Sequence, residues 1–369
     1  MPGASRCKPD ASGRRRNRCV APRPDRAPSP RRSLPCRRSD SSSVTSSSRR
    51  PSSSSWVSRR RRRGSTASGR RNHFHPWQDN QGHAGQAWVT LAALGQRTTI
   101  PFGTGVTCPT YRYEPAVVAQ AFASLGVLYP GRVFLGTGTG EAVNEFPASH
   151  EWGRYRERAD RLAEATEIIR RLWSGEWVSF QGQYYNVDDA HLYDLPREPI
   201  PIYMSGTGPQ SAELAGRIAD GLVGSAKETT TREIRDAWER GVRAAGKEPR
   251  GQEILAELMV VVGGEAEARE AADKWRFQPH AWDRYVEVPD PRTIAEEAQR
   301  QIPAEDAMKT YVIGDDPEPH VRRLTELFRA GITQAYVHSG QSDQRRVVEF
   351  YGSQVLPALR RELGHSAAA

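Results

Sequence analysis

Three short segments between residues 72 and 145 combine side chains suited to acid–base chemistry with glycines that can admit a ligand close to the backbone. They are His73-Phe74-His75-Pro76-Trp77, Gly103-Thr104-Gly105-Val106-Thr107-Cys108-Pro109-Thr110 and Gly136-Thr137-Gly138-Thr139-Gly140-Glu141. Histidine is a good candidate base because its pKa lies near neutral pH, and glycine leaves room beside the backbone. The second and third segments lie at the ends of candidate β-strands. We therefore expect the three segments to meet as loops of one active site.

Each segment alone also has an ordinary structural explanation. A lone histidine is more often structural, and the glycine-rich segment resembles a tight turn. That segment lacks the Gly-Lys-Ser/Thr of a phosphate-binding Walker loop and is not a convincing dinucleotide fingerprint. His73, His75 and His83 have no carboxylate or cysteine at ligand spacing, so no metal site is expected. The combination and order of the segments favour a functional role.

The chain of 369 residues consists of two chemically different parts. Residues 1–72 hold 20 Arg and 1 Lys against 3 Asp, with 18 Ser, whereas the remainder holds 32 basic and 41 acidic residues. The first part cannot bury enough apolar surface to offset its chain entropy, so we expect residues 1–71 to be disordered. No apolar run there is long enough for a signal peptide, and none in the chain predicts a membrane span.

The cysteines and the basic segment bear on location and partners. Cys7, Cys19 and Cys36 lie in the basic segment, and Cys108 is alone in the acidic part, which favours a reducing cytoplasm. A segment so rich in arginine would bind polyanions in a salt-dependent way, and this is the alternative function from another class. Apart from Trp56 it has no aromatic residues for base stacking, so no specific nucleic-acid partner is expected.

Short β-branched runs alternate with amphipathic stretches from residue 98 onward, which predicts a parallel sheet covered by helices. The expected strands are Thr98–Thr104, Arg132–Gly136, Pro201–Ser205, Gly221–Ser225, Ile254–Val262 and Thr333–His338. The expected helices are Ala116–Leu128, Tyr155–Trp173, Gln210–Ala219, Thr231–Ala245, Glu265–Trp275, Val321–Ala330 and Arg345–Arg361. This order predicts a (β/α)8 barrel over residues 72–363, followed by a tail at 364–369.

An eight-stranded barrel needs two further strands, which would have to precede His73, and residues 1–71 offer no clear candidate. The first strands are therefore expected to be missing or aberrant. One hypothesis is a frameshift or start-site artefact, because codons for Arg63-Gly64-Ser65-Thr66-Ala67-Ser68 can read Gly-Phe-Asp-Gly-Val in another frame. The nucleotide sequence would decide this.

With these motifs in view, the part from residue 72 onward resembles the luciferase-like superfamily. The segments His73–His83, Gly103–Pro109 and Gly136–Glu145 look closest to its coenzyme F420-dependent branch, which includes glucose-6-phosphate and hydroxymycolic acid dehydrogenases. The resemblance implies a TIM barrel with a deazaflavin at its C-terminal mouth. It also implies hydride transfer between an alcohol or aldose carbon and F420, with His73 as base, Trp77 as stabiliser and Glu141 as acid.

The same resemblance implies a set of cofactor-binding positions. They are Asn72, Gly105, Val106, Cys108, Asn144, Ser205, Gly206, Thr207 and Gly208. Gly105-Val106 matches a cis peptide bond of the family, and the segment Ser205–Gly208 could hold a phosphate at a helix N-terminus. Asn72 stands where the family usually has Asp, and Cys108 where a relative has a hydroxyl residue. An FMN-dependent monooxygenase of the same superfamily is the alternative within enzymes.

The substrate-binding positions depart from the sugar-phosphate pattern. Ser225, Lys227 and Arg284 are the expected contacts, but Thr310 stands where a relative has the third cation of the phosphate grip. Aromatic residues around Trp275–Trp282 suit a less polar substrate. We therefore expect a small-molecule alcohol or sugar phosphate, with glucose 6-phosphate as one candidate. Related enzymes are commonly homodimers.

Overall fold

The computed structural model describes residues 68–366 of the chain. The expected disorder of the segment 1–71, its polyanion binding and the frameshift hypothesis concern residues that lie almost wholly outside this range. No helix between residues 68 and 366 has the length and apolar character needed to cross a bilayer.

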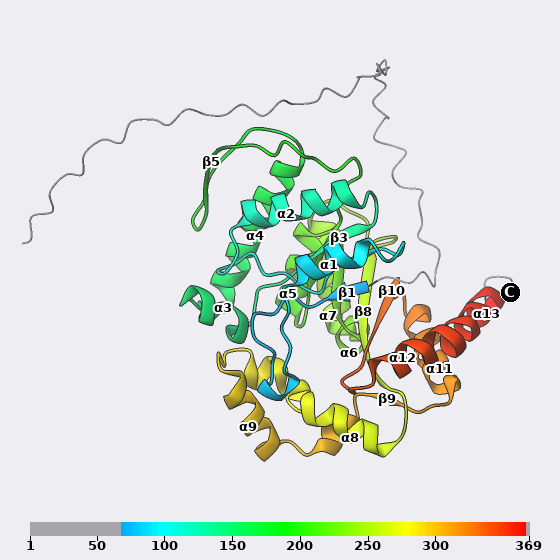
Figure 1. Ribbon diagram of the computed structural model, residues 1–369. Helices are drawn as coiled ribbons and strands as arrows, with labels where there is room; N and C mark the ends of the chain where they lie inside the picture. Colours follow the sequence, from blue (N-terminus) through cyan, green and yellow to red (C-terminus); the bar gives the residue numbers. More distant parts are fainter. Residues whose placement is uncertain (1–67, 367–369) are drawn as a thin grey trace, which may run out of the picture. The chain divides into compact units, whose positions relative to one another are not determined.

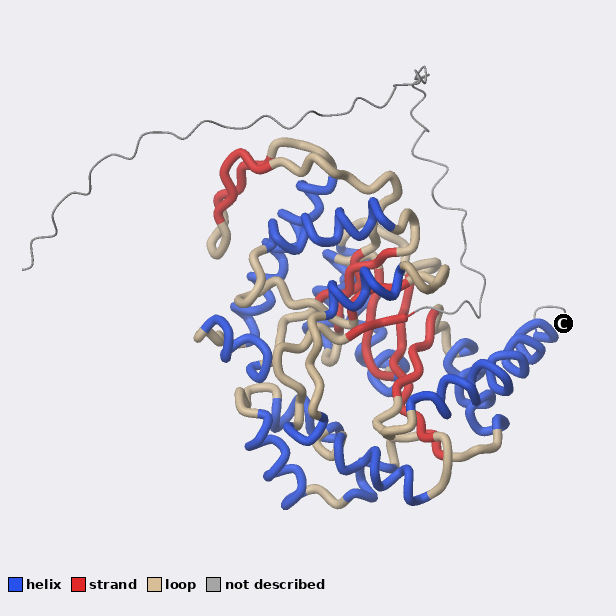
Figure 2. Tube along the Cα trace, viewed as in Figure 1, coloured by secondary structure: helices blue, strands red, loops and turns tan. Residues whose placement is uncertain are grey.

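The fold is organised around an all-parallel sheet in the order β1-β2-β3-β6-β7-β8-β10, with β9 also paired to β8. Figure 1 and Figure 2 show these strands surrounded by helices. The strands are β1 Ser68–Arg70, β2 Phe102–Thr104, β3 Val133–Thr137, β6 Ile202–Ser205, β7 Gly221–Ser225, β8 Glu253–Val261, β9 Val312–Ile313 and β10 Gln334–His338. All six strands expected from the sequence are confirmed.

The helices alternate with these strands, as parallel pairing requires. The larger ones are α1 Ala87–Gly95, α2 Pro115–Leu128, α3 Ala142–Ser149, α4 Tyr155–Trp173, α5 Pro209–Ile218, α7 Arg232–Ala244, α8 Glu265–Lys274, α9 Pro291–Gln301, α11 Pro317–Arg329, α12 Gln344–Phe350 and α13 Leu356–Ser366. Short helices are η1 Asp79–Gln81, α6 Ala226–Thr230, η2 Gln278–His280, η3 Ala281–Tyr285, α10 Ala304–Met308 and η4 Tyr351–Val355. In α4 the apolar residues at helical spacing, Leu162, Ala165, Ile168, Ile169 and Leu172, are buried.

The two faces of the strands have different surroundings, which is the signature of a barrel wall. One face belongs to a large apolar core shared with the helices, which includes Phe102 and Leu135 of the strands and Ile169 of α4. The other face carries a small cluster of Phe134, Tyr203 and Leu255. Alternate residues of each strand therefore point outward to the helices and inward to the barrel interior.

The first strand corrects the expectation for the N-terminal part. Residues 68–71 were assigned to the disordered segment, but Ser68–Arg70 form β1, which pairs in parallel with Phe102–Thr104 of β2. The small and charged composition of this strand hid it from sequence reasoning. Within residues 68–366, β1 and β10 are the two edges of the sheet and are not paired with each other. One of the two additional strands is thus present, and the described sheet is an open barrel.

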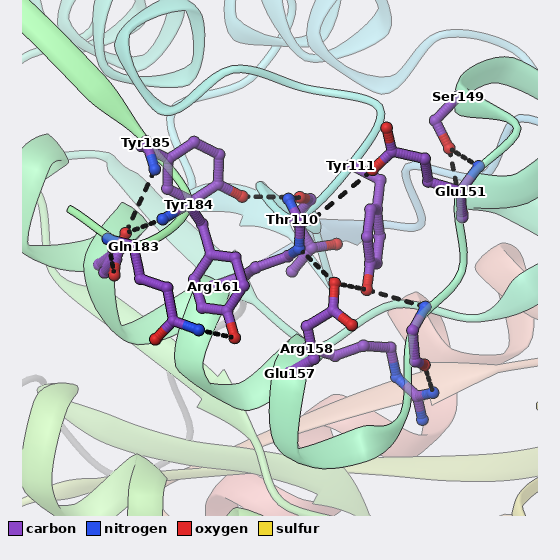
Figure 3. A network of polar contacts seen from close by, with 12 residues as sticks. Thr110, Tyr111, Ser149, Glu151, Glu157, Arg158, Arg161, Gln183, Tyr184 and Tyr185 are labelled. Carbon is purple, nitrogen blue, oxygen red and sulfur yellow. Dashed lines mark hydrogen bonds and ion pairs between the residues drawn. The ribbon is translucent and has the colours of Figure 1, made fainter.

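A two-stranded hairpin, β4 Val178–Gln181 and β5 Asn186–Ala190, was not expected from the sequence. Figure 3 shows that the loop of this hairpin lies against α4 and against the last residues of the second motif. The Tyr185 hydroxyl lies 2.6 Å from the Thr110 carbonyl oxygen and 3.0 Å from that of Pro109. Arg161 of α4 lies over the rings of Tyr111 and Tyr184. The hairpin therefore fixes the segment 109–111.

We expect Tyr185→Phe to lower the free energy of unfolding by about 1–3 kcal/mol, because buried carbonyl groups lose their donor. Thermal or urea unfolding of the variant measures the change. Tyr193→Phe is the matched control, since Tyr193 is 81% exposed. An equal effect of the two substitutions would contradict the role given to the Tyr185 hydroxyl.

Candidate active site

A cavity of about 1710 Å³ opens at the carboxyl ends of the parallel strands. Its lining includes the last residues of β2, β6, β7 and β10, namely Thr104, Ser205, Ser225 and His338. The carboxyl ends of barrel strands are where active sites of this architecture lie. Of the expected site residues, those that line the cavity are His73, Trp77, Gly105, Val106, Glu141, Ser205, Thr207, Ser225 and Lys227.

His73 is half-buried in the cavity wall, with its ring 6.2 Å from the Trp77 ring and edge-on to it. Burial, together with the positive charges of Arg71 and Arg112, lowers the pKa of His73 to about 3. We expected a pKa near neutral pH, so this expectation is not met. The imidazole is therefore neutral at physiological pH, so it has a ring nitrogen that can accept a proton.

Asn72 and Asn144 lie behind the cavity wall and are both 2% exposed. The Asn72 amide donates to Thr107 Oγ1 at 3.1 Å, and the Phe74 N–H donates to Asn144 Oδ1 at 2.8 Å. Neither residue lines the cavity. Asn72 precedes His73 in the chain and Asn144 binds the backbone of Phe74 after it, so both hold the loop of His73. Their contact with a ligand stays a prediction.

Glu141 is the N-cap residue of α3 and lines the cavity, although only 9% of its surface is exposed. Burial raises the pKa of Glu141, while the Asn144 amide, which donates to Oε2 at 3.0 Å, opposes this rise. A carboxyl group with a raised pKa keeps its proton to higher pH than an ordinary glutamate. Glu141 can therefore serve as a proton donor.

The second motif forms part of the wall of the cavity that His73 and Glu141 also line. The peptide bond Gly105-Val106 is cis, as expected, and both residues line the cavity. A Cβ atom added to Gly105 would meet nothing within 4 Å, so the backbone is directly open to the cavity at this point. Cys108 is buried behind the wall, where burial raises the pKa of its thiol, and it does not line the cavity.

The loop Ser205–Gly208 leads into α5 as expected, but its amides are not free. The N–H groups of Thr207 and Gly208 both donate to Ser211 Oγ at 3.1 Å, and the Ser211 hydroxyl donates to the Gly208 carbonyl oxygen at 2.9 Å. Ser205 and Thr207 line the cavity, whereas Gly206 and Gly208 do not. A phosphate at this helix N-terminus would have to displace the Ser211 hydroxyl from the two amides.

The expected substrate contacts divide into two groups. Ser225 caps α6 by accepting the Glu228 N–H at 3.2 Å, and exposed Lys227 lines the cavity without an ion pair among residues 68–366. Arg284 is exposed outside the cavity lining, 3.4 Å from Gln301 Oε1. Thr310 does line the cavity. The expected contact of Arg284 with substrate in the cavity is therefore not supported by its position.

Aromatic side chains from the segment 275–285 form one wall of the cavity. Phe277 stacks on Trp77 with ring centroids 4.8 Å apart, and Trp282 meets Trp77 edge-on at 6.0 Å. The sequence left open whether these aromatics belong to the core or to a pocket. Phe277 is 2% exposed and packs in the core, whereas Trp282 is 44% exposed. Both residues also line the cavity.

Sequence reasoning missed a charged cluster in the cavity. Arg71 donates to both carboxylate oxygens of Glu257 at 2.7 and 2.6 Å, and His338 Nδ1 lies 3.0 Å from the same carboxylate. Although burial alone would raise the pKa of Glu257, Arg71 and His338 hold it well below its usual range. A signal was present, since Glu257 interrupts an otherwise apolar strand. Arg71 was hidden among the arginines of the N-terminal segment.

Comparisons with known proteins identify the family of this chain. The family model described as "Luciferase-like monooxygenase" matches residues 72–334. The F420-dependent hydroxymycolic acid dehydrogenase of Mycobacterium tuberculosis is 47% identical over 290 residues, which cover 78% of this chain and 79% of that protein. The F420-dependent glucose-6-phosphate dehydrogenase of Nakamurella multipartita is 38% identical over 298 residues, which cover 79% and 88%.

Among solved structures, an F420-dependent secondary alcohol dehydrogenase in complex with an F420-acetone adduct matches with a TM-score of 0.73 and 33% identity, over 79% of this chain and 89% of that one. The F420-dependent tetrahydromethanopterin reductase of Methanopyrus kandleri matches at a TM-score of 0.59 and 21% identity, which shows the fold alone. The family match, the identities and the shared barrel lead to one conclusion: this chain is a member of the luciferase-like family.

Proposed function

We propose that this protein is a coenzyme F420-dependent oxidoreductase that moves a hydride between an alcohol carbon of its substrate and the deazaflavin. The observation that carries the proposal is that His73, Trp77, Glu141 and the cis-bonded pair Gly105-Val106 all line one cavity. Three of the proteins named above, with 33–47% identity to this chain, are F420-dependent dehydrogenases. The free, buried thiol of Cys108 suits a cytoplasmic site of action.

The residues present fit a large planar cofactor. The cavity of about 1710 Å³ can hold a cofactor and a substrate together. The backbone at Gly105 is open to the cavity, and the side chain of Val106 offers an apolar surface beside it. Thr207 and Ser205 provide polar groups in the lining of the same cavity. When bound, the deazaflavin would supply the carbon that accepts or returns the hydride.

The protein's own residues would manage the protons. As the alcohol is oxidised, its hydroxyl proton passes to the neutral imidazole of His73. The Trp77 indole, held by Phe277, would wall the reacting centre and exclude water. Glu141 would exchange a proton with the cofactor, for which its raised pKa is suited. Catalysis then depends on the fixed positions of the three side chains.

The substrate is inferred to be an alcohol without a requirement for a phosphate group. Lys227 lines the cavity, but Arg284 lies outside it and Thr310 has no charge. A phosphate dianion loses most of its hydration in such a site and needs several paired cations to compensate. The aromatic wall of Trp77, Phe277 and Trp282 favours a substrate with apolar surface. Glucose 6-phosphate stays a candidate to be tested against such alcohols.

An FMN-dependent monooxygenase has less support. The monooxygenase structures that match are 16–19% identical to this chain, so they share the fold and nothing more can be drawn from them.

We expect purified protein to bind F420 and to bleach its absorbance when a suitable alcohol is added without oxygen. The hydride leaves the alcohol and reduces the deazaflavin, so no oxygen is consumed. An anaerobic titration with F420 and a panel of secondary alcohols and sugar phosphates measures this. Retention of FMN together with oxygen consumption would instead support the monooxygenase.

His73→Gln is expected to lower kcat by about 10²–10⁴-fold, because the variant has no group to take the hydroxyl proton. The affinity for F420, measured by fluorescence titration, should change little. His75→Gln is the matched control, because His75 is half-buried on the same loop but does not line the cavity. Unchanged turnover in His73→Gln would refute the assignment of the base.

Lys227→Met is expected to raise the KM of an anionic substrate about tenfold or more, because a charge-assisted contact is lost. The KM of a neutral alcohol should stay within about twofold. Arg284→Met should affect neither substrate, since its side chain lies outside the cavity lining. A large rise in KM for Arg284→Met would show that the segment 281–285 closes over the substrate.

A further inference from the structure

The backbone on both sides of His73 is held by groups connected to α3. On the C-terminal side, the Phe74 N–H donates to Asn144 Oδ1 at 2.8 Å. On the N-terminal side, the Asn72 carbonyl oxygen accepts from Arg112 Nη2 at 2.7 Å. Asn144 is a residue of α3, and Arg112 is bound to the next residue of that helix, Glu145. The position of His73 therefore depends on α3, whose N-cap is Glu141.

Glu145 is a second buried carboxylate, one helical turn behind Glu141. Its side chain is 0% exposed, and that of Arg112 is 9% exposed. Glu145 Oε2 accepts the backbone N–H of Arg112 at 3.0 Å, and Oε1 lies 3.7 Å from Arg112 Nη2. Glu145 does not line the cavity and cannot touch a ligand there. Its interaction with Arg112 is the contact through which it can influence the reaction.

Arg112 is confined on its remaining sides. Its guanidinium lies 4.4 Å from the Tyr113 ring centroid and 5.9 Å from that of Phe74. Two other titratable groups interact electrostatically with Glu145, namely the Glu141 carboxyl group and the Cys108 thiol. Burial raises the pKa of Glu145 to about 7, and Arg112 opposes this rise. Buried charges of this kind are stable only when they are paired.

We propose that Glu145 is a positioning residue, which acts through Arg112 to hold the backbone of His73 at a set place relative to Glu141. The base and the acid of the reaction are then fixed to one helix, the acid directly and the base through the bridge from Glu145 to Arg112 to Asn72. The roles of His73 as base and Glu141 as acid rest on the proposed function. The contacts that hold His73 in place are between residues of this chain and do not depend on it.

An arginine–carboxylate pair could instead serve only to stabilise the fold, so the test needs such a pair elsewhere. The pair of Arg170 and Asp220 is more exposed than that of Arg112 and Glu145, with side chains 39% and 37% exposed, but it has the same bonding pattern. Asp220 accepts Arg170 Nη2 at 2.9 Å and the Ile202 N–H at 2.9 Å. Like Glu145, it thus binds both an arginine and a backbone amide. Ile202 begins β6, so this pair lies at the end of the strands opposite to the cavity. Asp220→Asn is therefore the matched control for Glu145→Gln.

Two measurements compare Glu145→Gln with Asp220→Asn in the full chain. The first is steady-state kinetics with F420 and an alcohol, beside thermal unfolding of both variants. The second is NMR of the protein without cofactor, prepared with carbon-13-labelled histidine, in which the His73 resonance is assigned from its loss in His73→Gln. The NMR measurement needs no turnover, so it tests the positioning even if the proposed function fails.

We expect Glu145→Gln to lower kcat by about 10- to 100-fold and to shift the His73 resonance, with KM changed less than about threefold. Asp220→Asn should lower the unfolding temperature without either effect. If Glu145→Gln does not fold, Arg112→Lys replaces it, because an ammonium group keeps the charge but removes the guanidinium Nη2 that lies against both the Asn72 carbonyl oxygen and Glu145. Equal kinetics for the tested variant and Asp220→Asn, or an unmoved His73 resonance, would overturn the proposal. Failure of the wild type to use F420, with the resonance shift intact, would refute only the proposed function.

Discussion

The close approach of β2 and β3 is the constraint on which the site depends. A Cβ atom on Gly136 would lie 1.9 Å from the Thr104 carbonyl oxygen, so no other residue fits there without moving a strand. The two segments stay hydrogen-bonded beyond the end of β2. The Thr107 N–H donates to the Gly136 carbonyl oxygen at 2.8 Å, and the Gly138 N–H donates to the Thr107 carbonyl oxygen at 3.3 Å. The two loops are thereby joined along their length. This places the Gly105-Val106 wall beside the segment that leads to Glu141.

Pairing of charges decides what the cavity can bind. Of its cationic lining residues, Arg71 binds Glu257, Lys274 binds Glu270, Lys309 binds Asp306 and Arg323 binds Glu326. Among the described residues, this leaves Lys227 as the lining cation without an ion pair. A cation already bound to a carboxylate contributes little to holding an anion. The cavity lining thus contains several basic residues, but most of their positive charge is balanced by neighbouring carboxylates.

The sequence predicted the strands and most of the larger helices because alternation of apolar runs is a local property. Ser68–Arg70 escaped prediction because a short edge strand can form from residues with no strand preference when a neighbouring strand offers backbone partners. The hairpin β4–β5 escaped because its strands are polar and largely exposed. In the site, motifs identified His73 and Glu141, which lie within recognisable loops. Glu257 and Arg112 were missed because their importance comes from partners 186 and 40 residues away in the chain.

The aromatic wall is coupled to the reacting loops and does not stand apart from them. The Phe277 N–H donates to Gln78 Oε1 at 3.2 Å beside the first motif, and the Val286 carbonyl oxygen accepts the Ala142 N–H at 2.9 Å at the start of α3. Trp282 Nε1 donates to Glu228 Oε1 at 2.8 Å on α6. The segment 277–286 is thus attached to three separate loops of the barrel mouth. The wall that would contact the substrate is therefore hydrogen-bonded to the loop that carries His73 and to the start of the helix that carries Glu141.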